Sequence, residues 1–186
     1  EPQMAYYPSC LRPYFKKQEL FASFAAPLGA RKKVASYPIK IRQLNNTKLS
    51  QELKAIFELL SEVFISTDHP TPTLSEFIAF HEKLLPLLKL KYVWLAEDGD
   101  KVIGLCFSFI YNNELFFKTM AVHPDYRRLS VGQALYNTCV SLAEEEGCRR
   151  EYYLFVKSGR LMNQLMPRSV EKVAESLIGV VASSDD

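Results

Sequence analysis

The sequence predicts a single α+β domain in three layers, with helices flanking a sheet. Two observations carry this prediction. The spacing of apolar residues switches along the chain between the period of a strand and the period of a helix. It predicts the order β-α-α-β-β-β-α-β, followed by a short helix and a last strand. Three of these strands are consecutive and joined by tight turns, as in a meander. The 186 residues, 48% of them hydrophobic, suffice for one domain with a hydrophobic core.

The first elements of the domain are a strand and two helices. A strand is expected near 38–44, where apolar and polar residues alternate. Apolar residues at helical spacing predict a helix near 48–64. A second helix is expected to begin at the capping box Thr73–Glu76 and to run to about Leu85, because such a box satisfies free amides at a helix start.

A three-stranded meander follows. Tyr92–Glu97 and Lys101–Ile110 are strands joined at Asp98–Asp100, where Asp-Gly tolerates the positive φ of a hairpin turn. Asn112-Asn113 forms a second turn, and Glu114–Val122 is the third strand of the meander.

The remaining elements are less regular. A helix with one apolar stripe follows the third strand and ends at Gly147, a natural C-terminal cap. Glu151–Val156 is another strand. A short helix near 161–166 and a last strand near 175–181 complete the expected order.

Two regions are expected along the chain. Residues 1–36 hold many aromatic residues and prolines without a clear period. They are expected to form an N-terminal extension that packs on the domain, or the remnant of a preceding domain, since disordered segments are usually poor in aromatic residues. Residues 37–186 are expected to form the domain itself. The sequence leaves open whether the chain is a fragment of a longer protein.

The composition narrows the function classes. The formal net charge is +2 and the longest basic run is Arg31-Lys32-Lys33, so no nucleic-acid partner is expected. No apolar stretch reaches the roughly 18 residues that span a membrane, and no signal peptide is visible. None of the four cysteines forms a C-x-x-C pair, which fits a reducing, cytoplasmic location without zinc.

A metal site is not expected elsewhere either. His69 and His81, with Asp68 and Glu82, are the nearest approach to a ligand set. A separation of 12 residues between the histidines and the turn between them argue against a shared metal ion.

The most informative segment runs from Met120 to Leu135 and consists of a strand, a tight polar turn and an amphipathic helix. The first amides of a helix lack partners within the helix, and the helix dipole adds positive charge there, so a diphosphate can bind. Gly132 lets phosphates approach the backbone, and Arg127 and Arg128 add charged contacts. The alternative is an ordinary helix start whose arginines face water.

This segment closely resembles motif A of the GNAT acyltransferase superfamily. Val122-His123-Pro124-Asp125-Tyr126-Arg127 matches its lead-in, and Arg127-Arg128-Leu129-Ser130-Val131-Gly132 matches its core, [Q/R]-x-x-G-x-[G/A]. The order of elements from about 37 to 156 matches as well. More narrowly, Tyr6-Tyr7-Pro8, Leu74–Phe77 and Met162–Leu165 resemble segments of uncharacterised bacterial GNAT-like proteins.

The resemblance implies the GNAT fold, with a mixed, mostly antiparallel sheet whose fourth and fifth strands splay apart. It implies acetyl-CoA or another acyl-CoA as co-substrate, and no metal. The pantetheine arm would pair with the fourth strand near a bulge, and the Met120 amide would polarise the thioester carbonyl. The residues expected to bind the cofactor are Met120, Ala121, Val122, Arg127, Arg128, Leu129, Ser130, Val131, Gly132, Gln133 and Asn163.

The chain departs from the family pattern at three places. Ser130 stands where the family has glycine; it can still act as an N-cap, but its side chain crowds the phosphates. Leu129 replaces a residue that is often lysine or glycine. The helix near 161–166 lacks the tyrosine that many members use to protonate the leaving thiolate.

Three residues are candidates for catalysis. Tyr152 and Tyr153 lie on the fifth strand, and one of them faces the gap if the strand alternates, although packing in the sheet is the favoured reading of both. Glu114 is a candidate general base, with a solvated turn-edge carboxylate as the favoured alternative. His123 is interpreted as structural, because in this motif it belongs to the turn.

The resulting hypothesis is an acyl-CoA-dependent N-acyltransferase, in which a small-molecule or peptide amine attacks the thioester directly. The acceptor is expected near the loop Ser66–Thr73, which holds Asp68 and His69. The alternative is a GNAT-fold module that binds acyl-CoA or a partner without turnover. A homodimer or an intramolecular partner domain fits either. The acceptor, the acyl length and the general base stay open.

Overall fold

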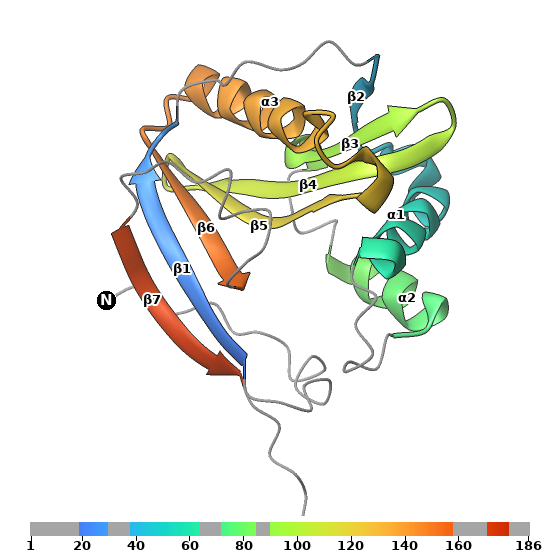
Figure 1. The fold of residues 1–186 in the computed structure, drawn as a ribbon, viewed down its shortest axis with the longest axis horizontal. Helices are drawn as coiled ribbons and strands as arrows, with labels where there is room; N and C mark the ends of the chain where they lie inside the picture. The colour runs from blue at the N-terminus through green and yellow to red at the C-terminus, as the bar shows by residue number, and fades with distance from the viewer. Residues whose placement is uncertain (1–18, 30–37, 64–71, 85–89, 158–170, 179–186) are drawn as a thin grey trace, which may run out of the picture.

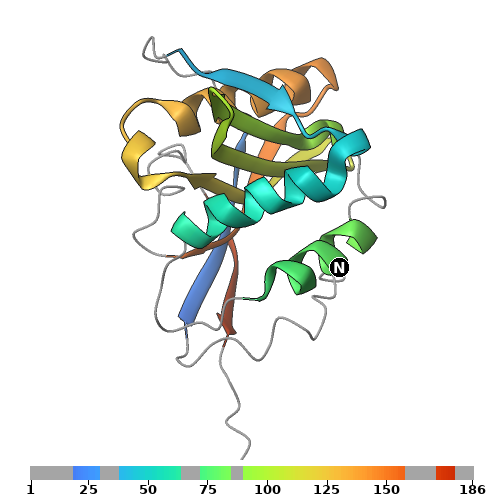
Figure 2. The ribbon, with the colours of Figure 1, turned by 90° about the vertical axis from the view of Figure 1, so that its right-hand side faces the viewer.

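The computed structural model describes residues 19–29, 38–63, 72–84, 90–157 and 171–178. A seven-stranded sheet forms the middle layer, with helix α3 on one face and helices α1 and α2 on the other (Figures 1 and 2). The strands are β1 Glu19–Pro27, β2 Lys40–Gln43, β3 Val93–Asp98, β4 Lys101–Tyr111, β5 Glu114–Val122, β6 Arg150–Lys157 and β7 Glu171–Ile178. The helices are α1 Leu49–Val63, α2 Leu74–Leu84 and α3 Val131–Glu145, with short 3-10 turns η2 Asn46–Lys48, η4 Leu90–Tyr92 and η5 Pro124–Tyr126.

The strand order is β2-β3-β4-β5-β6-β1-β7. The single parallel pair in this order joins β5 to β6, and every other neighbouring pair is antiparallel. Parallel pairing arises there because α3 crosses from the end of β5 back to the start of β6. The predicted α+β class and the mixed, mostly antiparallel sheet are confirmed.

The local signals in the sequence predicted most boundaries. The capping box forms, since the Thr73 amide donates to Glu76 Oε2 at 2.7 Å and the Glu76 amide donates to Thr73 Oγ1 at 3.3 Å. Gly99 has φ 59° in the first turn of the meander, and Gly147 has φ 78° after α3. The last predicted strand appears as β7 and begins earlier, at Glu171. The short helix expected near 161–166 lies outside the described residues.

Strand β1 was not anticipated. It lies within residues 1–36, which the sequence analysis set apart as an extension, yet it is hydrogen-bonded between β6 and β7. Its sequence, ELFASFAAP, shows no strict alternation of apolar and polar residues, so the period of two that predicts a strand is absent. A boundary at residue 36 therefore separates β1 from the sheet that it joins.

Each face of the sheet carries its own hydrophobic core. The cluster beneath α3 includes Met120, Val122 and Leu135, whereas the cluster beneath α1 and α2 includes Leu53, Phe77 and Ala121. Gly104 of β4 lets α3 approach closely, because a Cβ there would stand 2.9 Å from Val131 Cγ1 and 3.0 Å from Leu135 Cδ1. The start of α3 is thereby seated directly on β4.

Candidate functional site

Strands β5 and β6 are paired at one end only. Their parallel register runs from Glu114 opposite Arg150 to Phe117 opposite Tyr153. Beyond this point β5 continues to Val122 and β6 to Lys157, and the described residues show no further pairing between them (Figure 1). The expected splay of the fourth and fifth strands of the domain is therefore present, as β5 and β6.

A bulge in β5 marks the point where the two strands part. Phe107 of β4 faces Thr119, but its neighbour Ser108 faces Phe117, so Lys118 is the extra residue. The bulge was expected near Met120 to Val122 and lies just before them. Because a bulge bends its strand, it turns the end of β5 away from β6.

The backbone of Met120 and Val122 faces the open side of β5. The His123 amide donates to Ile103 O at 2.9 Å, and Ala121 lies opposite Leu105. Since hydrogen-bonding direction alternates along an antiparallel strand, the N–H and C=O groups of Met120 and Val122 point away from β4. No described strand pairs with them there. Their side chains, like that of Ala121, are buried, so these three residues offer a ligand backbone groups rather than side chains.

The turn after β5 is held by its own backbone. His123 O accepts from the Tyr126 amide at 3.0 Å, and Pro124 O accepts from the Arg127 amide at 3.2 Å. The Tyr126 hydroxyl donates to Asp98 Oδ2 at 2.9 Å, which fixes the turn to the β3–β4 hairpin. The path of the chain into α3 is thereby defined.

The start of α3 leaves several amides free. The first backbone bond of the helix is donated by the Ala134 amide to Ser130 O, at 2.9 Å. Among the described residues, the amides of Val131, Gly132 and Gln133 have no backbone acceptor, as expected for a helix start. The side-chain Nε2 of Gln133 is buried and also has no partner within the described ranges.

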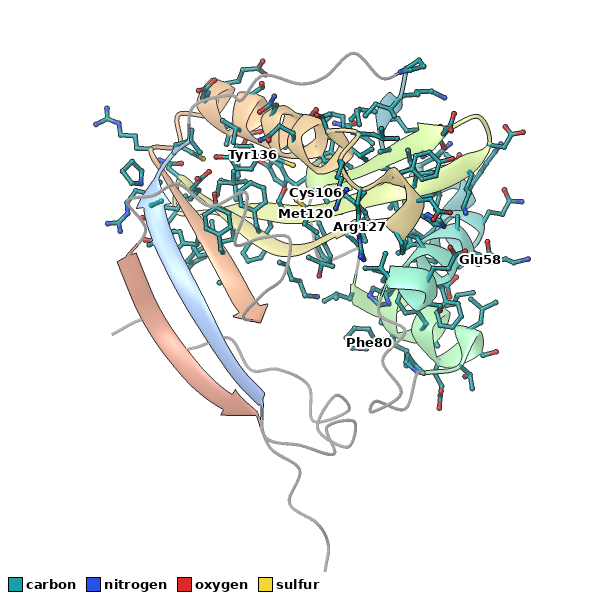
Figure 3. The ribbon with its side chains drawn as sticks, in the orientation of Figure 1. Glu58, Phe80, Cys106, Met120, Arg127 and Tyr136 are labelled. Atoms are coloured by element: carbon teal, nitrogen blue, oxygen red, sulfur yellow. The ribbon has the colours of Figure 1, made fainter. Side chains whose placement is uncertain are left out.

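Two exposed arginines stand beside these amides. Arg127 and Arg128 are both exposed, and neither forms an ion pair with another described residue. Figure 3 labels Arg127 at the turn between β5 and α3. Free amides, the helix dipole and two exposed guanidinium groups together make this corner suitable for a diphosphate. The residues present therefore fit the cofactor that the sequence predicts.

Ser130 stands where the resemblance implies a glycine, and its backbone has a conformation that glycine adopts most easily. Its φ of 61° and ψ of 17° are left-handed, and its side chain makes no capping hydrogen bond. It stands at the N-cap position as the sequence analysis allowed, but without the side-chain bond that makes serine a favourable cap. A non-glycine residue in this conformation costs about 1–2 kcal/mol.

His123 has the structural role that was expected. It is buried, and its Nδ1 accepts from the Asp125 amide at 3.2 Å. Its Nε2 contacts the Glu62 carboxylate of α1 and lies 2.8 Å from Lys101 Nζ. The imidazole therefore ties the turn to the end of α1.

Glu114 and Tyr152 are brought together, at the paired end of the two strands. The Tyr152 hydroxyl donates to Glu114 Oε1 at 3.0 Å, and its ring stacks on Phe116 with centroids 4.6 Å apart. Both lie before the last paired residues, Phe117 and Tyr153. They face away from α3, because Phe117 and Tyr153 belong to the cluster beneath that helix.

Tyr153 lies in the core. Its hydroxyl donates to Glu151 Oε1 at 2.6 Å, and Tyr136 donates to the same carboxylate at 3.0 Å. Burial, and next the Glu151 charge, raise the pKa of Tyr153 far above its usual value. This geometry favours packing, the reading that the sequence analysis preferred, over donation of a proton in the gap.

A cleft on the opposite face was missed by the sequence analysis. It lies beneath α1 and α2 beside the bulge, and His81, Lys118 and Thr119 line it together with apolar residues. His81 had been weighed only as a metal ligand. No periodic signal distinguishes Lys118, because the bulge that turns it to this face is not written in the hydrophobic pattern.

Several predictions fall outside what can be observed. Asn163, Asp68 and His69 lie outside the described residues. Within the described part of the chain, no three His, Cys, Asp or Glu side chains are grouped so that they would hold a metal ion. The helices described are also too short or too polar to cross a membrane.

Comparisons with known proteins agree with this geometry. The sequence profile of the family described as "Acetyltransferase (GNAT) family" matches residues 53–164. A curated relative, the putative [ribosomal protein bS18]-alanine N-acetyltransferase of Bacillus subtilis, is 29% identical over 39% of this chain and 47% of its own length.

Solved structures share the fold. A GCN5-related N-acetyltransferase from Sphaerobacter thermophilus has a TM-score of 0.61 at 14% identity, covering 91% of this chain and 53% of its own. The ribosomal-protein-S18-alanine N-acetyltransferase of Escherichia coli has a TM-score of 0.50 at 16% identity, covering 68% and 72%. The chain thus spans about half the length of the Bacillus and Sphaerobacter proteins. The family profile covers more than half of the chain, and the splayed strands and the open helix start agree with it. The chain therefore belongs to the GNAT acetyltransferase family.

Proposed function

We propose that this chain binds acetyl-CoA, or another acyl-CoA, and transfers the acyl group to an amine. The observation that carries the proposal is the set of free amides at the start of α3, next to the open side of β5. The proposal draws further support from membership of the GNAT family and from the names of the relatives.

The cofactor-binding residues follow from this placement. The amides of Val131, Gly132 and Gln133 would hold the diphosphate, with Arg127 and Arg128 adding positive charge from the turn. Leu129 and Ser130 shape the path into the helix. Met120 and Val122 would pair with the pantetheine amides along the open side of β5, and Ala121 keeps this stretch buried between the two cores. Asn163 stays in the proposal from the family resemblance alone.

The reaction balances without a covalent intermediate on the protein. When bound, acetyl-CoA supplies the acyl group as a thioester. An ammonium acceptor must lose two protons to become an amide; one ends on the coenzyme A thiol and one in solvent. The Met120 amide would stabilise the developing oxyanion. Glu114 and Tyr152 stay candidates from the family resemblance alone, because they are hydrogen-bonded to each other at the paired end of β5 and β6, about 20 Å along β5 from Met120.

The acceptor, the location and the assembly of the protein are also part of the proposal. We take the acceptor as a small-molecule or peptide amine and the location as cytoplasmic. The latter fits the free thiols of Cys106, Cys139 and Cys148. We also take a homodimer or an intramolecular partner domain as the form of assembly.

A ligand titration tests the proposal. Acetyl-CoA at about 100 times its Kd is expected to raise the free energy of unfolding by about 2.7 kcal/mol, hence Tm by about 5–10 °C. Thiol release with a panel of amines is expected to accompany it. The double variant Arg127→Ala/Arg128→Ala should bind at least about tenfold more weakly. Unchanged affinity in that variant would remove the diphosphate assignment.

A module without turnover is the second candidate. The left-handed Ser130 and the buried hydroxyl of Tyr153 favour it, because both depart from what catalysis in this family uses. Stabilisation by acetyl-CoA with no thiol release for any amine would select this candidate.

A further inference from the structure

The turn between β5 and α3 is held by acidic side chains from two other elements. Asp98, at the end of β3, accepts a hydrogen bond from the Tyr126 hydroxyl at 2.9 Å. Glu62, in the last turn of α1, contacts Nε2 of His123. The His123 and Tyr126 rings pack edge to face, with centroids 5.5 Å apart. The turn therefore depends on segments that are distant from it in the sequence.

His123 is the residue through which α1 reaches this turn. Its backbone amide donates to Ile103 O at 2.9 Å, and its carbonyl accepts from the Tyr126 amide at 3.0 Å. Its side chain is only 6% exposed, whereas that of Glu62 is 47% exposed. Arg127, which the proposed function assigns to the diphosphate, follows His123 by one turn of chain. A change in how His123 is held is therefore passed directly to the cofactor corner.

The hydrogen bonds of His123 define its tautomer. The Asp125 amide donates to Nδ1 at 3.2 Å, and because an amide N–H only donates, the lone pair of the ring is on Nδ1. The single proton of the neutral ring is then on Nε2, which donates it to the Glu62 carboxylate. Lys101 Nζ lies 2.8 Å from Nε2 and 3.8 Å from the carboxylate, so it adds positive charge beside the accepting oxygen.

The other tautomer does not fit these partners. It would direct an N–H group at the Asp125 amide, so that two donors face each other, and it would leave Nε2 with no proton to donate to Glu62. Among the described residues, Glu62 supplies the carboxylate that contacts Nε2. The choice between the two tautomers, and with it the bond to the Asp125 amide, therefore depends on Glu62.

We infer that Glu62 is a positioning residue for the cofactor: its carboxylate fixes the tautomer of His123, and His123 fixes the turn that presents Arg127 and the start of α3. The inference rests on the proposed function, since the diphosphate is the group that is positioned. Glu62 acts through His123 and does not itself bind the ligand. A turn that samples other conformations must be ordered when the diphosphate binds, so its loss of order appears as weaker binding.

Calorimetric titration with acetyl-CoA tests this role. Glu62→Ala is expected to raise the Kd about three- to tenfold. Its Tm should fall by less than about 4 °C, because a half-exposed ion pair contributes little to stability. Glu62→Gln should keep the Kd within about twofold of the wild type, since its amide oxygen accepts the same hydrogen bond. Glu58→Ala removes an exposed carboxylate one turn earlier in α1, so it is the matched control and should leave the Kd unchanged (Figure 3).

Imidazole ¹⁵N spectra of the free protein observe the tautomer itself. The wild type and Glu62→Gln are expected to show His123 with its proton on Nε2, whereas Glu62→Ala should show a mixture of both tautomers. The chain has three histidines, so variants that lack His69 or His81 assign the signals.

The outcomes separate the two proposals. An unchanged Kd in Glu62→Ala, or an equal loss of affinity in Glu62→Gln, would overturn the positioning role and leave cofactor binding intact. A wild-type His123 with its proton on Nδ1 would overturn it as well, whatever the variants do. Failure of the wild type to bind acetyl-CoA would instead overturn the proposed function.

Discussion

Replacing Ser130 by glycine is expected to make the protein both more stable and a better binder of acetyl-CoA. Ser130 has φ 61° and ψ 17°, a conformation that costs a residue with a Cβ about 1–2 kcal/mol. Glycine adopts it freely but loses about 0.5–1 kcal/mol more backbone entropy on folding. The serine side chain makes no capping bond, so its removal forfeits none.

The net effect on stability is therefore a gain of about 0.5–1 kcal/mol. For a chain of this length, that gain corresponds to a rise in Tm of about 1–4 °C. Removing the side chain also opens the approach to the free amides of α3, so the Kd for acetyl-CoA is expected to fall about two- to tenfold. Thermal unfolding measures the first effect, and isothermal titration calorimetry with acetyl-CoA measures the second.

A matched control lies in the same helix. Ser141 has regular helical neighbours, and its hydroxyl donates to Asn137 O at 2.8 Å. Ser141→Gly is therefore expected to lower stability by about 0.5 kcal/mol and to leave acetyl-CoA binding unchanged. If Ser130→Gly lowered Tm as the control does, the left-handed turn and the explanation of the family's glycine would both be refuted.

Three further predictions follow from the fold. Gly104→Ala puts a Cβ 2.9 Å from Val131 Cγ1, so it should lower stability by about 1–3 kcal/mol and weaken acetyl-CoA binding through the displaced helix; an unchanged Tm would contradict this close packing. The folded protein lowers the pKa of His81, so below pH 6.5 this histidine binds a proton more readily in the unfolded state than in the folded state. The wild type should therefore lose stability between pH 7.5 and 5.5, whereas His81→Gln should lose less; an equal loss in the two proteins, measured by denaturation at both pH values, would argue against it. Removing residues 1–29 takes β1 from between β6 and β7, so thermal unfolding followed by circular dichroism should lose its cooperativity. Removing residues 1–18 leaves β1 in place and serves as the control. Equal melting of the two truncated proteins would show that β1 is dispensable.

The sequence predicted those helices and strands whose ends are set by residues close to them in the chain. The capping box at Thr73, the hairpin glycine Gly99 and the C-terminal cap Gly147 each fix a boundary within a few residues. The free amides at the start of α3 were also predictable, because a strand, a turn with two arginines and a helix follow one another directly.

The features that the sequence analysis missed depend on contacts between distant segments. Strand β1 has no alternation of apolar and polar residues, and its partners come from the other end of the chain. The bulge at Lys118 is a difference in register between β4 and β5, which no pattern within β5 reveals. The cleft depends on this bulge and on α2 together, so neither His81 nor Lys118 stood out.

The central claim is that the free amides at the start of α3 hold the diphosphate of coenzyme A. Two-dimensional ¹H–¹⁵N spectra of the labelled protein during titration with coenzyme A observe these amides individually. The account predicts that Val131, Gly132 and Gln133 show the largest shifts, followed by Met120 and Val122, and that Arg127→Ala/Arg128→Ala needs more ligand for the same change. Saturable binding that leaves the amides of α3 unshifted would contradict it.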